Sequence, residues 1–181
     1  MPIPNLDYFS IFQEEGHPFY DQLIQLNQQE FNNWVIENFS LLGTYNSFEE
    51  VAPNNDDIES LIEKGYNHIG SQCHYSAKAI TLLDNQYEYW TGFVIRNSFY
   101  FPYITHSFNV RDNRVVDFAR LENDLSVMTE NLNPEDIFNS TFPHIYFGIQ
   151  IPLDFIENYR RATLNENSMI PLLYEWYTEN I

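Results

Sequence analysis

The sequence is poor in basic residues and contains no long hydrophobic run. Its 181 residues include eight Lys and Arg against 26 Asp and Glu, which gives a formal net charge of −18. This charge repels nucleic acid phosphates and anionic membrane surfaces, so we expect neither nucleic acid nor membrane as a partner. No apolar run reaches about eighteen residues, and the first residues lack the basic and apolar regions of a secretory signal. We therefore expect a cytoplasmic protein.

Cysteine is also scarce, since Cys73 is the single one in the chain. One cysteine excludes an internal disulfide and a cysteine-rich zinc site. The histidines His68, His74 and His144 lack the helical spacing or the cysteine partners of a metal site, so we expect no metal and no cofactor. Cys73 is left to act as a thiol, a thiolate or a small buried apolar side chain.

The negative charge is concentrated at the start of the chain. Residues 1–63 hold twelve carboxylates and no Lys or Arg, and the first basic residue is Lys64. This segment could face a basic protein partner. Acidic surfaces also keep proteins in solution without any partner, and we favour that interpretation.

Length and hydrophobic pattern indicate one α+β domain over residues 1–181. No repeat or linker divides the chain, and Phe, Trp and Tyr make up 17% of it, which is ample material for a core. We distinguish a helical acidic part (1–65), a part with the cysteine helix and a sheet (66–151), and C-terminal helices (152–181). Because helices precede strands, we expect helices packed mainly on one face of an antiparallel sheet.

The spacing of apolar residues predicts the individual elements. Helices are expected at 19–39, at 73–83, and near 153–164 and 168–179. A further short helix is expected to begin at an N-cap, Asp56 or Asp57, with Leu61 and Ile62 facing inward. Strands are expected at 87–95, 100–110, 115–118 and 144–151, with a hairpin turn at 111–114.

Three residues suit a nucleophilic cysteine site, which needs a thiol of lowered pKa, an imidazole, and a group that orients the imidazole. A polar loop leads to Cys73 in the first turn of an apolar helix, where unpaired backbone N–H groups favour a thiolate. His106 lies in a predicted strand and Asp117 in the next. A turn at 112–113 places Asp117 opposite Phe108, and hence diagonal to His106 on the same face.

Each of the three also has an ordinary structural interpretation. Cys73 could be a small buried apolar residue, and His106 a hydrogen-bonded core residue. Asp117 could pair with Arg114 or Arg120. The conjunction of all three, on elements that suit each role, favours a site.

The order of Cys73, His106 and Asp117 resembles the papain-like superfamily, and within it most closely the transglutaminase-like cysteine hydrolases. The resemblance covers roughly residues 66–118. In those enzymes a His-Ala/Ser-Trp step commonly precedes an Asp on the next strand, and here His106-Ser107-Phe108 and Asp117 fill these places. His74 after the cysteine, Phe108 in place of Trp, and Phe118-Ala119 after Asp117 depart from the family pattern.

This resemblance implies a papain/transglutaminase-like fold and a cysteine hydrolase or acyltransferase that acts on an amide bond. The substrate would be a protein or peptide, and the reaction that of a protease, a glutamine deamidase or a transglutaminase. It also implies a side-chain amide that helps to hold the oxyanion, for which Asn67 is the first candidate and Gln72 the second. The alternative is a non-enzymatic acidic interaction or inhibitor protein on the same frame.

Overall fold

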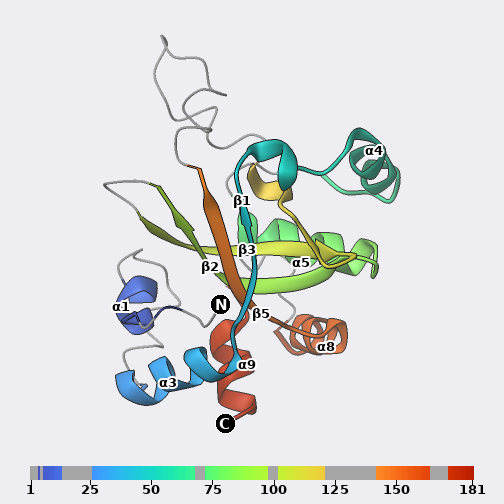
Figure 1. The fold of residues 1–181 in the computed structure, drawn as a ribbon. Helices are drawn as coiled ribbons and strands as arrows, with labels where there is room; N and C mark the ends of the chain where they lie inside the picture. The colour runs from blue at the N-terminus through green and yellow to red at the C-terminus, as the bar shows by residue number, and fades with distance from the viewer. Residues whose placement is uncertain are drawn as a thin grey trace, which may run out of the picture.

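The computed structural model describes residues 4, 6–13, 26–67, 72–97, 102–120, 142–163 and 171–181. Figure 1 shows a strongly twisted sheet with helices packed around it. The helices are α1 (Tyr8–Gln13), α3 (Gln28–Asn38), α4 (Asn55–Glu63), α5 (Cys73–Leu83), α8 (Leu153–Thr163) and α9 (Leu173–Glu179). The strands are β1 (Ser40–Tyr45), β2 (Glu88–Arg96), β3 (Tyr103–Arg111), β4 (Arg114–Val116) and β5 (His144–Gln150), and η1 (Phe48–Glu50) and η2 (Phe118–Arg120) are short 3-10 helices.

The described strands form one sheet in the order β1-β5-β2-β3-β4, and every pair in it is antiparallel. The predicted α+β class with an antiparallel sheet is therefore confirmed. The prediction that residues 1–65 are helical is wrong for Ser40–Tyr45, which form an edge strand. This strand is short and carries a register shift between Leu41 and Gly43, so it lacks the regular alternation that marks a strand in sequence.

One face of the sheet carries most of the helices. Phe93 of β2 and Phe147 of β5 are paired on this face and pack against Phe31 of α3 and Leu173 of α9. Farther along β2, Tyr89 points the same way and packs against α5 and α8. The prediction of helices mainly on one face is thus confirmed.

The opposite face is closed by the curvature of the sheet and by the segment after η1. Val94, Phe108 and Tyr146 come from three strands and pack with Val51. The rings of Phe108 and Tyr146 meet edge to face, with centroids 5.1 Å apart. This aromatic floor lies on the same face as His106, which is two residues from Phe108 along β3.

The first long helix, α3, starts later than its hydrophobic pattern predicts. Asn27 caps it, because the Asn27 side chain accepts hydrogen bonds from the backbone N–H groups of Gln29 and Glu30. The prediction of one helix over 19–39 is wrong at this point, and its residues 19–25 lie outside the described part of the chain.

The next helix, α4, also has a different cap from the one predicted. Asn54, and not Asp56 or Asp57, accepts the capping hydrogen bond, which comes from the Asp57 N–H at 2.8 Å. Leu61 is buried as expected, but Ile62 is 57% exposed and the prediction for it is wrong. One residue along a helix turns the side chain by about 100°, so neighbours of this kind rarely share an inner face.

The other elements match their predicted ranges, apart from some of their ends. β3 begins at Tyr103 and α9 at Leu173. β4 ends at Val116, so Asp117, predicted in the strand, directly follows it, and Phe118 lies in η2. Parts of the predicted elements and of the loop before Cys73 (68–71, 100–101 and 164–170) lie outside the described residues. Within the described residues, no helix has the length and hydrophobicity needed to cross a membrane.

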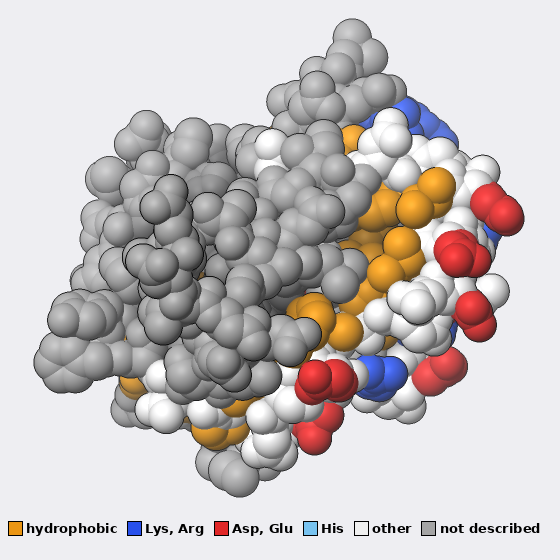
Figure 2. Space-filling view, turned by 90° about the horizontal axis from the view of Figure 1, so that it is seen from above, with side chains coloured by type: hydrophobic (Ala, Val, Ile, Leu, Met, Phe, Trp, Pro, Cys, Tyr) orange, Lys and Arg blue, Asp and Glu red, His pale blue; other side chains and the backbone are white. Residues whose placement is uncertain are grey.

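The acidic residues do not gather on one face of the described structure. In Figure 1, α3 and α4 lie at opposite ends of the molecule, and both carry carboxylates of the segment 1–63. Figure 2, a view from above, shows Asp and Glu side chains along one edge of a hydrophobic strip. The negative charge of this segment is therefore dispersed.

Candidate functional site

A buried imidazole and a buried carboxylate are in direct contact beside the aromatic floor, on the same face of the sheet. His106 Nε2 lies 2.7 Å from Asp117 Oδ2, and the two residues are 5% and 0% exposed. The Tyr146 hydroxyl donates to the same carboxylate oxygen at 2.8 Å. The backbone N–H of Asp117 donates to the Val51 carbonyl at 2.8 Å, which fixes the main chain at this point.

The hairpin between β3 and β4 explains this contact. Asp112 and Asn113 both have positive φ, 53° and 61°, as a tight two-residue hairpin turn requires. Asn109 therefore pairs with Val116, and the next step of the same register sets Asp117 beside Phe108. The predicted register is confirmed, and Asp117 reaches the diagonal neighbour His106 on the same face.

Cys73 is the first residue of α5, as predicted, and is half-buried. The imidazoles of His106 and His74 both act on the pKa of its thiol. Since Nε2 of His106 is bonded to Asp117, Nδ1 is the ring nitrogen left for the thiol. The structure thus places His106 in contact with Asp117 and within electrostatic reach of Cys73.

Two opposing effects act on the thiol, and the charge effect prevails. Burial by itself would raise the pKa of Cys73, but the charges of His74 and His106 and hydrogen bonds from both lower it well below its usual value. Burial would likewise lower the pKa of His106, yet Asp117 and the Cys73 thiolate raise it to about 9. Both shifts favour a thiolate and an imidazolium at neutral pH.

The helix that carries the thiol is anchored to β3 by a buried amide. Asn109 Nδ2 donates to the Ala77 carbonyl at 2.9 Å and to Thr81 Oγ1 at 3.1 Å. Gln72 is the N-cap residue of α5, and its side chain makes no capping hydrogen bond. The Gln72 side chain therefore does not occupy the first N–H groups of α5, the kind of donor that a thiolate or an oxyanion requires.

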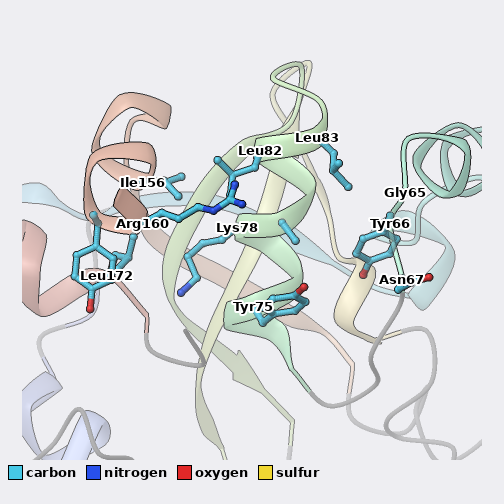
Figure 3. Close-up of a pocket in the computed structure, with 12 residues that line it drawn as sticks. Gly65, Tyr66, Asn67, Tyr75, Lys78, Leu82, Leu83, Ile156, Arg160 and Leu172 are labelled. Carbon is cyan, nitrogen blue, oxygen red and sulfur yellow. The ribbon is translucent and has the colours of Figure 1, made fainter. Parts of the chain in front are cut away.

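The two candidates for the oxyanion amide lie on opposite sides of residues 68–71. Gln72 is half-buried directly before Cys73, and Asn67 is exposed. Asn67 borders a groove of about 200 Å³ along α5, and Figure 3 shows it with Tyr66 on one side of the helix, with Arg160 and Leu172 on the other. The choice between Asn67 and Gln72 stays a prediction.

This groove passes beside the triad without including it. Its lining comprises Tyr75, Lys78, Ala79, Leu82 and Leu83 of α5, together with Gly65, Tyr66, Asn67, Ile156, Tyr159, Arg160 and Leu172. Lys78 is only 6% exposed, and burial lowers its pKa to about 7 against the opposing charges of Glu175 and Cys73. Lys78 thus lines the groove, and its pKa also responds to the charge of Cys73.

Asp117 does not form an ion pair with Arg114, which is one of the two structural interpretations of this residue. The Arg114 guanidinium donates instead to backbone carbonyls around η1, among them Glu50 at 2.9 Å. The side chain of Arg120 lies outside the described part of the structure. Asp117 contacts His106 and Tyr146.

Two residues of the site are missed by sequence reasoning. Tyr146 comes from β5, and no local pattern signals that its hydroxyl reaches Asp117. His74 stood out only as a departure from a family pattern, although its place directly after Cys73 could have marked it as a neighbour of the thiol.

Comparisons with known proteins add no identification. No family model, curated protein or solved structure matches this chain. Within the described residues, no group of three or more His, Cys, Asp or Glu side chains is placed to hold a metal ion.

Proposed function

We propose that the chain is a cysteine hydrolase or acyltransferase that acts on an amide bond, with Cys73, His106 and Asp117 as its catalytic residues. The observation that carries the proposal is the 2.7 Å contact between His106 and Asp117, beside a Cys73 thiol that acts on the pKa of the same imidazole. An antiparallel sheet behind a cysteine-bearing helix also supports a papain-like, transglutaminase-like arrangement.

The proposed chemistry uses a thioester intermediate. The Cys73 thiolate attacks the amide carbonyl carbon, and the C–N bond breaks as the His106 imidazolium gives its proton to the leaving amine. Water or a second amine then attacks the thioester, His106 accepts the proton of the attacking group, and the C–S bond breaks. Asp117 orients the imidazole and stabilises its charged form. The backbone N–H of Cys73, with Asn67 or Gln72, would hold the oxyanion.

The first experiment measures the reactivity of the thiol with iodoacetamide at about pH 6.5, where a free cysteine is about 1% thiolate. A fully ionised Cys73 gains about 100-fold in thiolate and loses about tenfold in nucleophilicity, so labelling should be about tenfold faster than for free cysteine. Labelling no faster than for the free amino acid would remove the enzyme proposal.

The second experiment looks for the acyl-enzyme directly. The protein is mixed with p-nitrophenyl acetate, a simple activated acyl donor, and its intact mass is followed. We expect an acetyl group on Cys73 that is absent from Cys73→Ala and forms slowly on His106→Ala. An acetyl group that appears equally on Cys73→Ala would belong to another nucleophile and would count against the site.

A second candidate function is an acidic interaction or inhibitor protein in which the triad is idle. The burial of His106 and Asp117, and a groove that does not include the triad, favour this candidate. The acylation experiment separates the two candidates, since an idle triad forms no thioester.

A further inference from the structure

The groove along α5 has a different charge from the rest of the chain. Its lining includes Lys78 and Arg160, two of the eight basic residues of the sequence. None of the described residues that line it is Asp or Glu, although acidic residues outnumber basic ones by 26 to 8. The groove is therefore a basic place on a strongly acidic protein, and it would attract an anion that the rest of the surface repels.

The two basic side chains come from different helices and enter the same space. Figure 3 shows the side chain of Arg160, on α8, and that of Lys78, on α5, between these two helices. Lys78 is 6% exposed, whereas Arg160 is exposed to solvent. Lysine has three N–H donors and arginine has five, so each can bind a ligand while it keeps a contact with the protein. The groove thus offers one buried and one exposed positive group.

Negative groups nearby set how much charge a ligand should carry. Glu175 of α9 does not line the groove, but its charge and that of Cys73 raise the pKa of Lys78, which burial lowers to about 7. The hydroxyl of Tyr159, which lines the groove, donates to Glu175 at 3.4 Å. These groups offset part of the positive charge, which favours a ligand with one negative charge over a ligand with several. An anion beside Lys78 would also favour its protonated form.

Beside the basic groups, the groove is apolar. Ile156 and Leu172 are 2% and 0% exposed, and Leu82 and Tyr159 pack against the cluster that they form. The groove volume of about 200 Å³ is smaller than that of ordinary ligand pockets, which begins at about 300 Å³. A cavity of about 150 Å³ is enough for benzene, so a phenyl ring with a short acidic chain fits this space.

We propose that this groove binds a small organic acid with one carboxylate and an apolar body of about the size of a phenyl ring. The carboxylate contacts Lys78 and Arg160, and the apolar body lies against the cluster of Leu82, Ile156 and Leu172. The planar guanidinium of arginine matches the two oxygens of a carboxylate, and the apolar body leaves water as it binds. The Cys73 thiol takes no part, so the proposal holds whether or not the protein is a hydrolase.

The proposal is tested first on the wild-type protein with three matched probes. Each is titrated into ¹⁵N-labelled protein and followed by NMR at about pH 6.5, where a carboxylate is ionised. We expect 3-phenylpropionate to bind and to shift amide signals of α5 and α8 that flank the groove. Its neutral analogue 3-phenylpropanamide should bind about tenfold more weakly, because it lacks the charge. Propionate, which lacks the ring, should also bind at least tenfold more weakly.

Two results of this titration would contradict the proposal. Equal affinity for the acid and its amide would mean that the basic groups do not recognise the ligand. Signal shifts confined to other parts of the molecule would place the ligand outside the groove.

Substitutions then test the two basic residues. Lys78→Met removes the charge, keeps a long side chain, and should weaken binding of 3-phenylpropionate about tenfold while leaving that of the amide unchanged. Arg160→Gln should weaken binding of the acid by up to about fivefold, since its charge is exposed. Arg161→Gln is the matched control, because Arg161 is the next residue on α8, is exposed, pairs with Glu157 and does not line the groove. It should bind like wild type.

Melting temperatures of the same samples show whether each variant is folded. A folded Lys78→Met protein that binds the acid like wild type would overturn the role of Lys78. Equal weakening by Arg160→Gln and Arg161→Gln would mean a general attraction to positive surface charge and would overturn the site. If Lys78→Met does not fold, the comparison of the two exposed arginines and that of the acid with its amide still decide.

Discussion

One carboxylate oxygen of Asp117 accepts hydrogen bonds from both His106 and Tyr146. A buried carboxylate needs such partners, since leaving a charge without them costs several kcal/mol. The same contacts fit two roles for Asp117. It could orient His106 for catalysis, or it could serve only to hold β4 and β5 together.

Substitutions at Asp117 and His106 distinguish these roles. Asp117→Asn keeps an oxygen for Tyr146 and should leave the fold intact, but it removes the charge that stabilises the imidazolium. We expect labelling at about pH 6.5 to slow by about tenfold, and His106→Ala to slow it at least as much. Melting temperature and labelling rate are measured on the same samples. A stable Asp117→Asn protein that labels at the wild-type rate would refute the triad.

The ion pair of His106 and Asp117 also predicts a dependence of stability on pH. In Cys73→Ala no thiol titrates, and Asp117 still raises the pKa of His106 above its unfolded value of 6.5. A raised folded pKa contributes stability that is complete below pH 6.5 and is lost as the pH rises through the folded pKa. We therefore expect the melting temperature of Cys73→Ala to fall as the pH rises above 6.5.

The control for this titration is Cys73→Ala/His106→Asn, which lacks the imidazole. Its melting temperature should change less over the same pH range. Equal slopes for the two proteins would mean that His106 is not held charged by Asp117.

At the scale of the elements, two strands of the sheet approach each other closely beside the site. Gly92 of β2 lies between His106 of β3 and Gly148 of β5. A Cβ atom on Gly92 would collide with the backbone of Phe147 and Gly148. Only glycine allows the two strands to approach this closely, and the position of β3 depends on it.

Gly92→Ala should therefore destabilise the protein by about 1–3 kcal/mol, because backbone atoms cannot move aside as a side chain can. In a chain of this size, that corresponds to a fall of roughly 2–12 °C in melting temperature, measured by calorimetry. Gly43→Ala in β1 is the control, since its new Cβ would meet the movable ring of Tyr45 at 3.1 Å. A fall no larger for Gly92→Ala would contradict this account of the packing.

The elements near the site are those that local sequence could predict. The Cys73 helix, the hairpin register and the His106–Asp117 contact follow from periodicity and from a two-residue turn, which act over a few residues. The contact of Tyr146 with Asp117 and the hydrogen bonds of Ser107 with His74 and Thr91 join elements that meet only in the folded protein. Likewise, Asn27 and Asn54 became caps through side-chain hydrogen bonds that compete with apolar spacing.

For the whole molecule, the net charge of −18 favours binding to a positively charged partner. The described acidic residues are spread over the molecule, however, which argues against a single surface dedicated to such a partner. The exposed acids Glu30 and Glu37 lie on α3, while Glu59 and Glu63 lie on α4 at the other end of the molecule. Asp57, also on α4, forms an ion pair with Arg111, whose guanidinium nitrogen lies 2.8 Å from the Asp57 carboxylate. A dispersed charge of this kind attracts any polycation without selecting one.

We therefore expect binding to poly-L-lysine at low salt that does not depend on which end is neutralised. Glu30→Gln/Glu37→Gln on α3 and Glu59→Gln/Glu63→Gln on α4 remove the same charge from opposite ends and should weaken binding equally. At roughly 0.5 M salt, where screening acts over about 4 Å, binding should vanish for all proteins. Affinity is measured by titration at several salt concentrations. A loss confined to one pair would reveal a partner face at that end and would favour the acidic interaction protein over the enzyme.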